Sequence, residues 1–495
     1  MASSPADPTT SQSKRLGKRT GTRRERTGCL TCRQRKKKCD GLYPICDQCR
    51  RLNFVCRRED PRQPVELGEK SRVHAAAHQA QSCSSPSSSS HACVLIPRTP
   101  DLSAFWLENG HGGEQTAADR RVILRYYTQT FTTLITTTLE NNCFLSVFMP
   151  MAMESPLFLD ALLAWSSSHL ALRIKAYEHI ALQNRCTALK SLSDSLASSH
   201  RSTEMELASC LVHCAMESIS GDTSEWFKHL VGAYEVIRSA ATVDGTACFD
   251  LGCFATTYEG RWLLRNFAYH DILMTVVEDR KPFLIAGQYW AFGDETVADS
   301  YFGLASRIMY LISEISILNV DMAQHPPDDK HKNNYSERGR AIEQELKSWK
   351  CGPSEDIMLI YLAETYRSAA LIHLYRTIRL RLPQFTVAIA NKMSAQVVEI
   401  VKMFQEMPAR CLPETSLLFP LFMAGGEAEK EDQIRVVRQR MLDMVQFRQF
   451  HNVEAALIVL EELWRVRANG ALGSGNRRVD WKDVLQRRNW MLSVV

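Results

Sequence analysis

The chain contains no apolar run long enough to cross a membrane. A helical span needs about 18 to 20 consecutive apolar residues, but the best candidate, residues 143–153, is shorter and contains Pro150. The first ten residues lead into a basic stretch rather than into the apolar core of a secretory signal. Mean hydropathy is −0.22. We therefore expect neither a membrane protein nor an exported one.

Disulfide bonds are also not expected, although the chain has 16 cysteines among 495 residues. Dense disulfide scaffolds belong to short secreted chains, and without an export signal the default compartment is reducing. The thiols should then be free or bound to metal. Full disorder is excluded because 45% of the residues are hydrophobic, enough for a large core and more than one domain.

Net charge is only +5, but it is unevenly distributed. Residues 1–60 hold 16 Lys and Arg against 6 Asp and Glu, whereas the rest holds 44 against 49. A basic head on a mildly acidic body predicts a polyanion-binding segment attached to a separately folded domain.

Composition divides the chain into four regions. Residues 1–28 are polar and basic and predict a disordered arm; within it, residues 14–26 are typical of a nuclear localisation signal or of added phosphate contacts. Residues 29–58 hold six cysteines. Residues 59–100 carry five prolines and a serine tract, which predicts a linker. Residues 101–495 have helical patterns throughout.

The fold class predicted for residues 101–495 is all-α. Ser155-Pro156 is a typical helix start, and Pro383 should end a helix over residues 365–382. Alternating strand patterns are scarce. Helical spacing places two sets of residues on single faces: Ile123, Tyr127, Phe131 and Leu134, and then Leu159, Leu163, Ser166 and Leu170.

The six cysteines follow the spacing C-x2-C-x6-C-x6-C-x2-C-x6-C: Cys29, Cys32, Cys39, Cys46, Cys49 and Cys56. Two thiolates two residues apart can hold one metal, and a thiolate set without oxygen donors favours tetrahedral Zn²⁺. Two tetrahedral Zn²⁺ ions have about eight ligand positions between them, and six thiolates fill only six if each binds one ion. Two thiolates must therefore bridge both ions. The repeat nominates Cys29 and Cys46. No position is left open for water, which predicts a structural metal site.

The segment RTGCLTCRQRKKKCDGLYPICDQCRRLNFVC resembles the fungal Zn2Cys6 binuclear zinc cluster DNA-binding domain. The likeness includes the basic run before Cys39, the Cys39-Asp40-Gly41 step and Pro44. It implies a nuclear, sequence-specific transcription regulator with two Zn²⁺ ions as cofactors and double-stranded DNA as partner.

The resemblance also implies that a first short helix reads a CGG-type triplet in the major groove. Lys36, with Arg35 beside it, is the base-contacting candidate, because Lys and Arg donate to guanine O6 and N7. Four other basic residues, Arg33, Lys38, Arg50 and Arg51, should contact phosphates and fix the register. The full set of DNA-binding candidates is Arg33, Arg35, Lys36, Lys37, Lys38, Arg50 and Arg51.

Two questions stay open from the sequence. The alternative function is a zinc-dependent nuclear protein-interaction factor whose cluster docks a protein partner rather than DNA. Oligomeric state is the second question, because prolines and serines interrupt the region where a coiled coil would follow the cluster. A homodimer through the helical region and binding of a monomer to a single site are both compatible with the sequence.

Scattered segments between residues 118 and 492 resemble the fungal-specific transcription factor regulatory domain. They include SEWFKHLVGAYEVIR, TYRSAALIHLYRTIR and DWKDVLQRRNWML. This looser likeness implies a helical scaffold for effector response and for binding co-regulators.

No catalytic constellation is evident, so we expect no enzyme. The His111-Gly112-Gly113 step comes without a G-x-S-x-G motif, and the glycines at 470, 473 and 475 precede no GK[ST]. Cys210, His213 and Cys214 could share a helix face and bind metal, but a buried core face is the favoured interpretation. Five tryptophans are expected as core anchors: Trp226, Trp262, Trp464, Trp481 and Trp490.

Overall fold

The computed structural model describes residues 38–39, 94–96, 115–198, 203–221, 223–241, 251–284, 297–325, 329–470 and 478–495. The chain divides into two compact units, residues 1–87 and 88–495. All described helices belong to the second unit. The expected basic arm, most of the cysteine cluster and most of the linker lie outside the described residues.

The described residues of the second unit form helices joined by turns; they contain no β-strand, only two isolated β-bridges. This confirms the all-α prediction. The first half contains α3 (Gln115–Tyr126), α4 (Thr132–Ile135), α5 (Cys143–Ser146), α6 (Phe148–Glu154), α7 (Pro156–Arg173), α8 (Glu178–Ala197), α9 (Thr203–Ser220), α10 (Glu225–Ala241), α11 (Gly252–Ala255) and α12 (Tyr258–Glu278). A π-helical turn, η2 (Tyr127–Phe131), joins α3 to α4, and a 3₁₀ turn, η3 (Lys175–Tyr177), joins α7 to α8.

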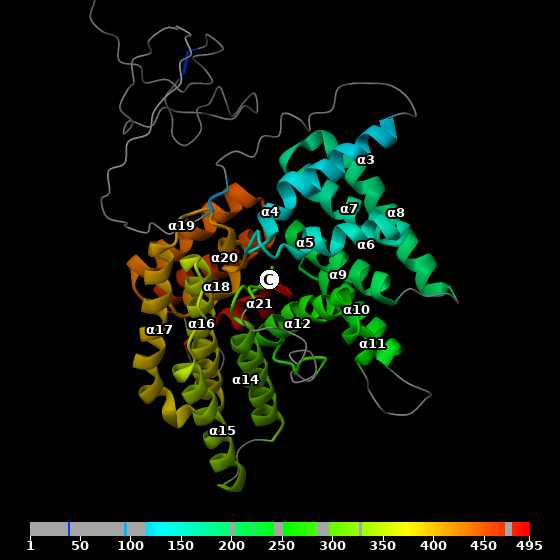
Figure 1. Cartoon of the computed structure of the whole chain (residues 1–495). Helices are drawn as coiled ribbons and strands as arrows, with labels where there is room; N and C mark the ends of the chain where they lie inside the picture. The colour runs from blue at the N-terminus through cyan, green and yellow to red at the C-terminus, as the bar shows by residue number, and fades with distance from the viewer. Residues whose placement is uncertain are drawn as a thin grey trace, which may run out of the picture. The chain divides into compact units, whose positions relative to one another are not determined.

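The second half contains α14 (Ser306–Gln324), α15 (Asp329–Ser348), α16 (Ile357–Arg381), α17 (Thr386–Glu406), α18 (Leu418–Glu427), α19 (Glu431–Arg448), α20 (His451–Ala468) and α21 (Trp481–Arg488). Two 3₁₀ turns, η4 (Pro383–Phe385) and η5 (Leu412–Ser416), precede α17 and α18. Figure 1 shows α3 to α12 gathered on one side of this unit and α14 to α20 on the other. Contacts of α12 with α14 and of α9 with α20 join the two sides.

Helix boundaries follow local chemistry. The Ser155 hydroxyl caps α7 by accepting a hydrogen bond from the Phe158 amide at 3.4 Å, and Pro156 occupies the first turn. The long helix α16 ends one residue before Leu382-Pro383, as the sequence predicts. The start of α16 at Ile357, capped by Asp356, lies eight residues before the expected one.

The predicted core faces are largely confirmed. Ile123, Tyr127, Phe131 and Leu134 are all buried. In α7 the burial is wider than one face, because every residue from Ala161 to Leu170 is buried. This helix packs against both α8 and α9, so little of its surface meets water.

Aromatic side chains fill the centre of the first half. Phe144 and Phe148 both meet the Trp262 ring edge-on, with ring centroids 5.7 and 4.8 Å apart. Trp226, Trp262 and Trp481 are fully buried and Trp464 is 6% exposed, so these four are core anchors as predicted. Trp490 is only half-buried but packs against the same core.

A buried arginine connects the two sides of the unit. Arg448, the last residue of α19, is fully buried and donates to the carbonyls of Leu134 and Cys411, the latter at 2.9 Å. Its own carbonyl oxygen lies 2.8 Å from Nε2 of His169 in α7. One residue thus bonds the end of α4, the residue before η5 and the C-terminal part of α7.

Candidate functional sites

The predicted zinc and DNA site lies almost wholly outside the described residues. Lys38 is exposed and Cys39 is half-buried. The other candidates lie outside: Cys29, Cys32, Cys46, Cys49 and Cys56 for zinc, and Arg33, Arg35, Lys36, Lys37, Arg50 and Arg51 for DNA. These assignments therefore stay predictions.

Residues 94–96, inside the expected linker, belong to the second unit and pair with the segment before η5. Leu95 forms an isolated bridge with Cys411, and the Ile96 amide donates to the Arg410 carbonyl at 3.0 Å. Ile96 is buried. The chain is therefore already attached to the helical unit a few residues before the point where the sequence places the end of the linker.

The second candidate metal group is a core face. Cys210, His213 and Cys214 are buried in α9, and the His213 ring stacks on His229 of α10 at 5.1 Å. Burial, with the His229 charge adding to it, lowers the pKa of His213 to about 3, so the ring is neutral. Nowhere in the described part of the chain do three metal-ligating side chains converge. The burial of Cys210, His213 and Cys214 confirms the predicted core face.

The helical unit brings together four charges that sequence reasoning missed: Arg376, Glu427 and Asp480 are buried, and Arg379 is partly exposed. Arg376 of α16 is 2.9 Å from Glu427 at the end of α18 and 2.8 Å from Asp480, the N-cap of α21. Arg379, one turn further along α16, binds Glu427 with two hydrogen bonds of 2.7 and 2.8 Å. Two guanidinium groups therefore balance two buried carboxylates, and Arg478 also lies 3.7 Å from Glu427.

Electrostatics keeps both carboxylates ionised. Burial alone would raise the pKa of Asp480, but the charges of Arg376 and Arg379 hold it well below its usual range. The pKa of Glu427 is lowered by the same two arginines against the same effect of burial. Arg376 also lies 4.4 Å above the Trp481 ring. Sequence could have suggested only that Arg376 and Arg379 share a face of α16; their partners come from other elements.

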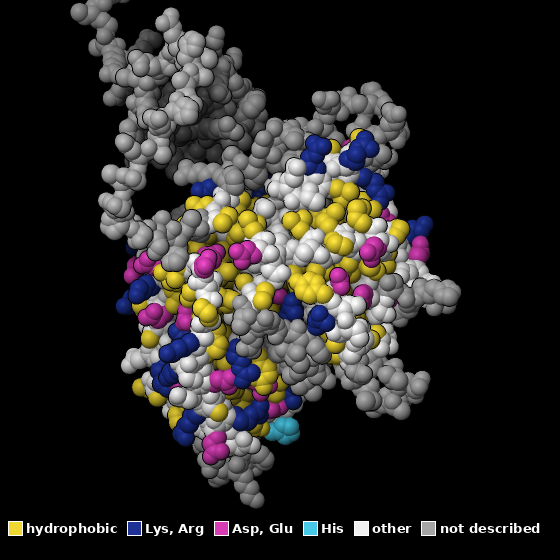
Figure 2. Space-filling view, in the orientation of Figure 1, with side chains coloured by type: hydrophobic (Ala, Val, Ile, Leu, Met, Phe, Trp, Pro, Cys, Tyr) yellow, Lys and Arg dark blue, Asp and Glu magenta, His cyan; other side chains and the backbone are white. Residues whose placement is uncertain are grey.

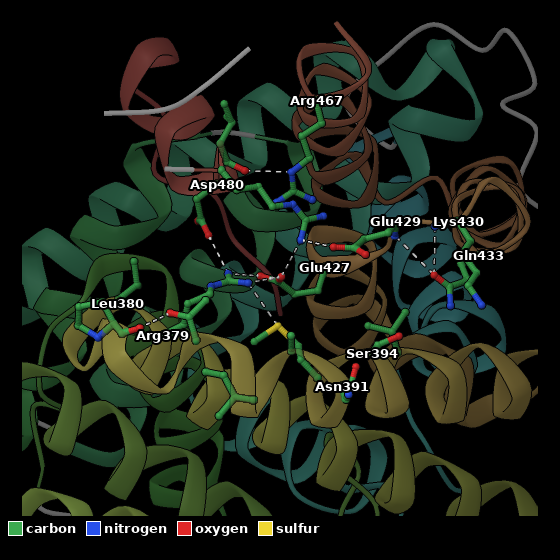
Figure 3. Close-up of a pocket in the computed structure, with 18 residues that line it drawn as sticks. Arg379, Leu380, Asn391, Ser394, Glu427, Glu429, Lys430, Gln433, Arg467 and Asp480 are labelled. Carbon is green, nitrogen blue, oxygen red and sulfur yellow. Dashed lines mark hydrogen bonds and ion pairs between the residues drawn. The ribbon is translucent and has the colours of Figure 1, made fainter. Parts of the chain in front are cut away.

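A cavity of about 650 Å³ opens beside this network (Figure 3). One wall is formed by the end of α16, by η4 and by α17; the other by the end of α18, the first turn of α19, the end of α20 and residues 478–480. Figure 3 shows Arg379, Glu427, Arg467 and Asp480 converging on one side, with Asn391 and Ser394 on α17. This volume is in the range of small-molecule sites.

On the face of the helical unit shown in Figure 2, Lys and Arg side chains are interspersed with Asp and Glu. No single-sign patch dominates the described residues visible there. The basic surplus of the chain is thus a property of residues 1–60 rather than of this face.

Comparisons with known proteins identify the family. Residues 122–495 match the model of the fungal specific transcription factor domain, and residues 27–64 match the fungal Zn(2)-Cys(6) binuclear cluster domain. The first match covers most of the chain, which therefore belongs to the fungal specific transcription factor domain family. Regulation of transcription through a zinc-dependent DNA-binding domain, with action in the nucleus, follows from these two families.

Similar proteins carry names of the same class. The transcriptional activator protein UGA3 of Saccharomyces cerevisiae is 22% identical over 90% of this chain and 93% of its own length. An uncharacterized transcriptional regulatory protein of Schizosaccharomyces pombe is 24% identical over 95% of this chain and 97% of its own. The transcription activator AMTR1 of Alternaria alternata is 61% identical over 33 residues, 7% of this chain and 4% of its own.

These families and relatives are regulators rather than enzymes. No solved structure matches the chain. Among the described residues, no helix combines the length and the apolar character that crossing a membrane requires.

Proposed function

We propose that this protein regulates transcription by reading CGG-type triplets in the major groove through a binuclear zinc cluster at residues 29–58. The observation that carries the proposal is the spacing of the six cysteines around a basic run, within the segment 27–64 that matches the cluster family. The basic surplus of residues 1–60 supports a nucleic acid as the partner.

The six thiolates fit two Zn²⁺ ions. The first ion would take Cys29, Cys32, Cys39 and Cys46, and the second would take Cys46, Cys49, Cys56 and Cys29. All six ligands are sulfur, which is the donor set that structural Zn²⁺ prefers. The bound metal supplies folding energy to a segment too short for a core of its own.

The basic residues divide into two roles in this proposal. Lys36, with Arg35 beside it, donates to guanine edges and supplies sequence preference. Arg33, Lys38, Arg50 and Arg51 neutralise phosphates, and Lys37 belongs to the same basic run. The described part of this set agrees with a surface role, since Lys38 is exposed.

The test is selection of DNA sites by the full chain, followed by affinity measurements over a range of salt concentrations. We expect enrichment of CGG-type triplets and a steep loss of affinity as salt rises, because bound phosphates release counterions. The absence of any enriched motif, together with salt-independent binding of a protein partner, would contradict the proposal and favour the cluster as a protein-docking module.

The oligomeric state is tested in the same experiment. A homodimer through the helical unit should select paired triplets, and the mass of its complex with DNA should correspond to two chains per duplex. Selection of single triplets by one chain indicates a monomer.

A further inference from the structure

None of the residues that line the cavity between α16, α17 and the ends of α18 to α20 is among the proposed DNA contacts. It lies in the helical unit, and all the residues that line it are described. Its walls differ in chemistry. One is mainly apolar, although Thr386, Asn391 and Ser394 also line it, and the other carries most of the charge.

The apolar wall comes mainly from α17 and from the segment before it. Ile389, Met393 and Val397 recur on one face of α17 and are buried, and Leu380 and Pro383 continue the surface toward α16. Because those three side chains are already buried, a hydrocarbon body in the cavity would remove from water mainly its own surface and the exposed apolar surface of Leu380, Pro383 and Ala390.

The charged wall has more cations than carboxylates that could neutralise them. All three lining carboxylates are already in ion pairs: Glu427 and Asp480 with Arg376 and Arg379, and Glu429 with Arg478 at 2.8 Å. Two lining cations, Arg467 and Lys430, form no ion pair among the described residues. The lining therefore has four cations against three carboxylates, although Glu427 and Asp480 also act electrostatically on Arg467.

Arg467 is held in place by the backbone. Its Nε donates to the Val479 carbonyl at 2.9 Å, and its Nη1 donates to the Gly426 carbonyl at 2.8 Å. Within the described residues its Nη2 donates no hydrogen bond. A guanidinium fixed by two bonds with a third nitrogen still available is preorganised to bind an anion.

Arg467 is charged at neutral pH although it is largely removed from water. Burial, and after it the neighbouring Arg478, lowers the pKa of Arg467 to about 10. An anion that reaches this group would therefore find a cation that water solvates poorly.

We propose that this cavity binds a small organic acid, with its carboxylate at Arg467 and Lys430 and its apolar body along Ile389, Met393 and Val397. A carboxylate suits a guanidinium because both are planar and can share two hydrogen bonds. A cationic ligand is disfavoured because each lining carboxylate already has its cation. The site is independent of the proposed DNA contacts, and its binding is measured without DNA.

The test uses calorimetric titration of the full chain with 4-phenylbutyrate as probe. Two controls separate the parts of the proposal: 4-phenylbutyramide has the same body without the charge, and inorganic phosphate has charge without the body. We expect saturable binding of one 4-phenylbutyrate per chain, at least tenfold tighter than either control. Equal affinity for the amide or for phosphate would overturn the proposal, as would no saturable binding at about millimolar probe.

Variants place the site on the chain. Arg467→Gln should weaken 4-phenylbutyrate binding about tenfold or more, whereas Arg435→Gln, at an exposed position of α19 outside the cavity, should leave it unchanged. Because Arg467 also holds two backbone carbonyls, Ser394→Trp is the second variant. Ser394 is an exposed position of α17 that lines the cavity, so a large ring there fills the space without entering the core. Binding that survives both changes would contradict the assignment.

Discussion

The cysteine-rich segment at residues 29–58 and the helical unit differ in what can stabilise them. The segment has few apolar side chains, so metal ligation must supply its folding energy. The helical unit buries aromatic residues and three charges, Arg376, Glu427 and Asp480. Because the first depends on a few ligands at fixed spacing and the second on packing across the chain, a change in one should leave the other intact.

The largest expected effect is on the zinc segment. Cys32→Ala removes a ligand that no other residue replaces, so we expect loss of zinc and of DNA binding, since structural zinc contributes about 10–16 kcal/mol to such folds. The thermal unfolding of the helical unit should not change. Zinc content, DNA affinity and circular dichroism of the full chain measure the three properties.

The matched control is Cys186→Ala, at an exposed position of α8. It should retain zinc, DNA binding and the unfolding midpoint of the parent chain. Sequence-specific DNA binding by metal-free Cys32→Ala would show that recognition of DNA does not depend on zinc.

The next largest effect tests the helical unit. Glu427→Gln leaves Arg376 and Arg379 with one buried carboxylate between them, and breaking such a pair costs about 3–5 kcal/mol. Urea unfolding followed by circular dichroism should show this loss, while zinc content and DNA affinity stay unchanged. Glu225→Gln, which removes a surface pair with Lys228, should change the midpoint little.

The same carboxylates predict acid sensitivity. The pKa values of Glu427 and Asp480 are lowered in the folded protein. Their contribution is therefore complete above the unfolded values of about 4 and is lost as pH falls below them. Glu427→Gln should flatten the fall in stability below about pH 4. A parallel fall in parent and variant would show that other groups cause it.

A smaller effect separates the two kinds of DNA contact. Lys36→Ala should cost about 1–3 kcal/mol on the selected site and relax preference for guanine. Arg33→Ala should weaken binding to all sequences alike and reduce the slope of log affinity against log salt by about one. Affinities for matched and scrambled duplexes at several salt concentrations distinguish them. Equal losses on both duplexes for Lys36→Ala would assign it to phosphate.

The predictable features are local ones. Cysteine spacing within 28 residues predicts the cluster family, and Ser155-Pro156 and Pro383 correctly place two helix ends. Each depends on neighbours in sequence, where geometry is fixed by the backbone. The cluster family is therefore evident without any knowledge of the packed core.

The features that escaped prediction depend on tertiary contact. Arg376 and Asp480 are 104 residues apart, and the sequence around either residue does not indicate that the two side chains pair. Arg448 is a basic residue at the end of a helix, a position that is usually exposed. It is nevertheless fully buried, because the carbonyl groups of Leu134 and Cys411 accept its hydrogen bonds. The π-helical turn at Tyr127–Phe131 keeps its apolar spacing and so resembles an ordinary helix in the sequence.

The smallest expected effect tests one of those local rules. Ser155→Ala removes the side-chain acceptor for the Phe158 amide, and loss of an N-cap costs about 0.5–2 kcal/mol. The hydrogen bond is long at 3.4 Å, so the loss should fall at the lower end of that range. Urea unfolding of the helical unit measures it.

Ser155→Asp provides the matched comparison, because it keeps an acceptor and places a negative charge at the positive end of α7. It should match or exceed the parent in stability, while Ser155→Ala falls below both. If all three unfold at the same urea concentration, packing of α7 against α8 and α9 fixes the start of the helix without the cap. The Ser155-Pro156 pair would then mark the start of α7 in the sequence, but the Ser155 cap would not contribute to the stability of the helix.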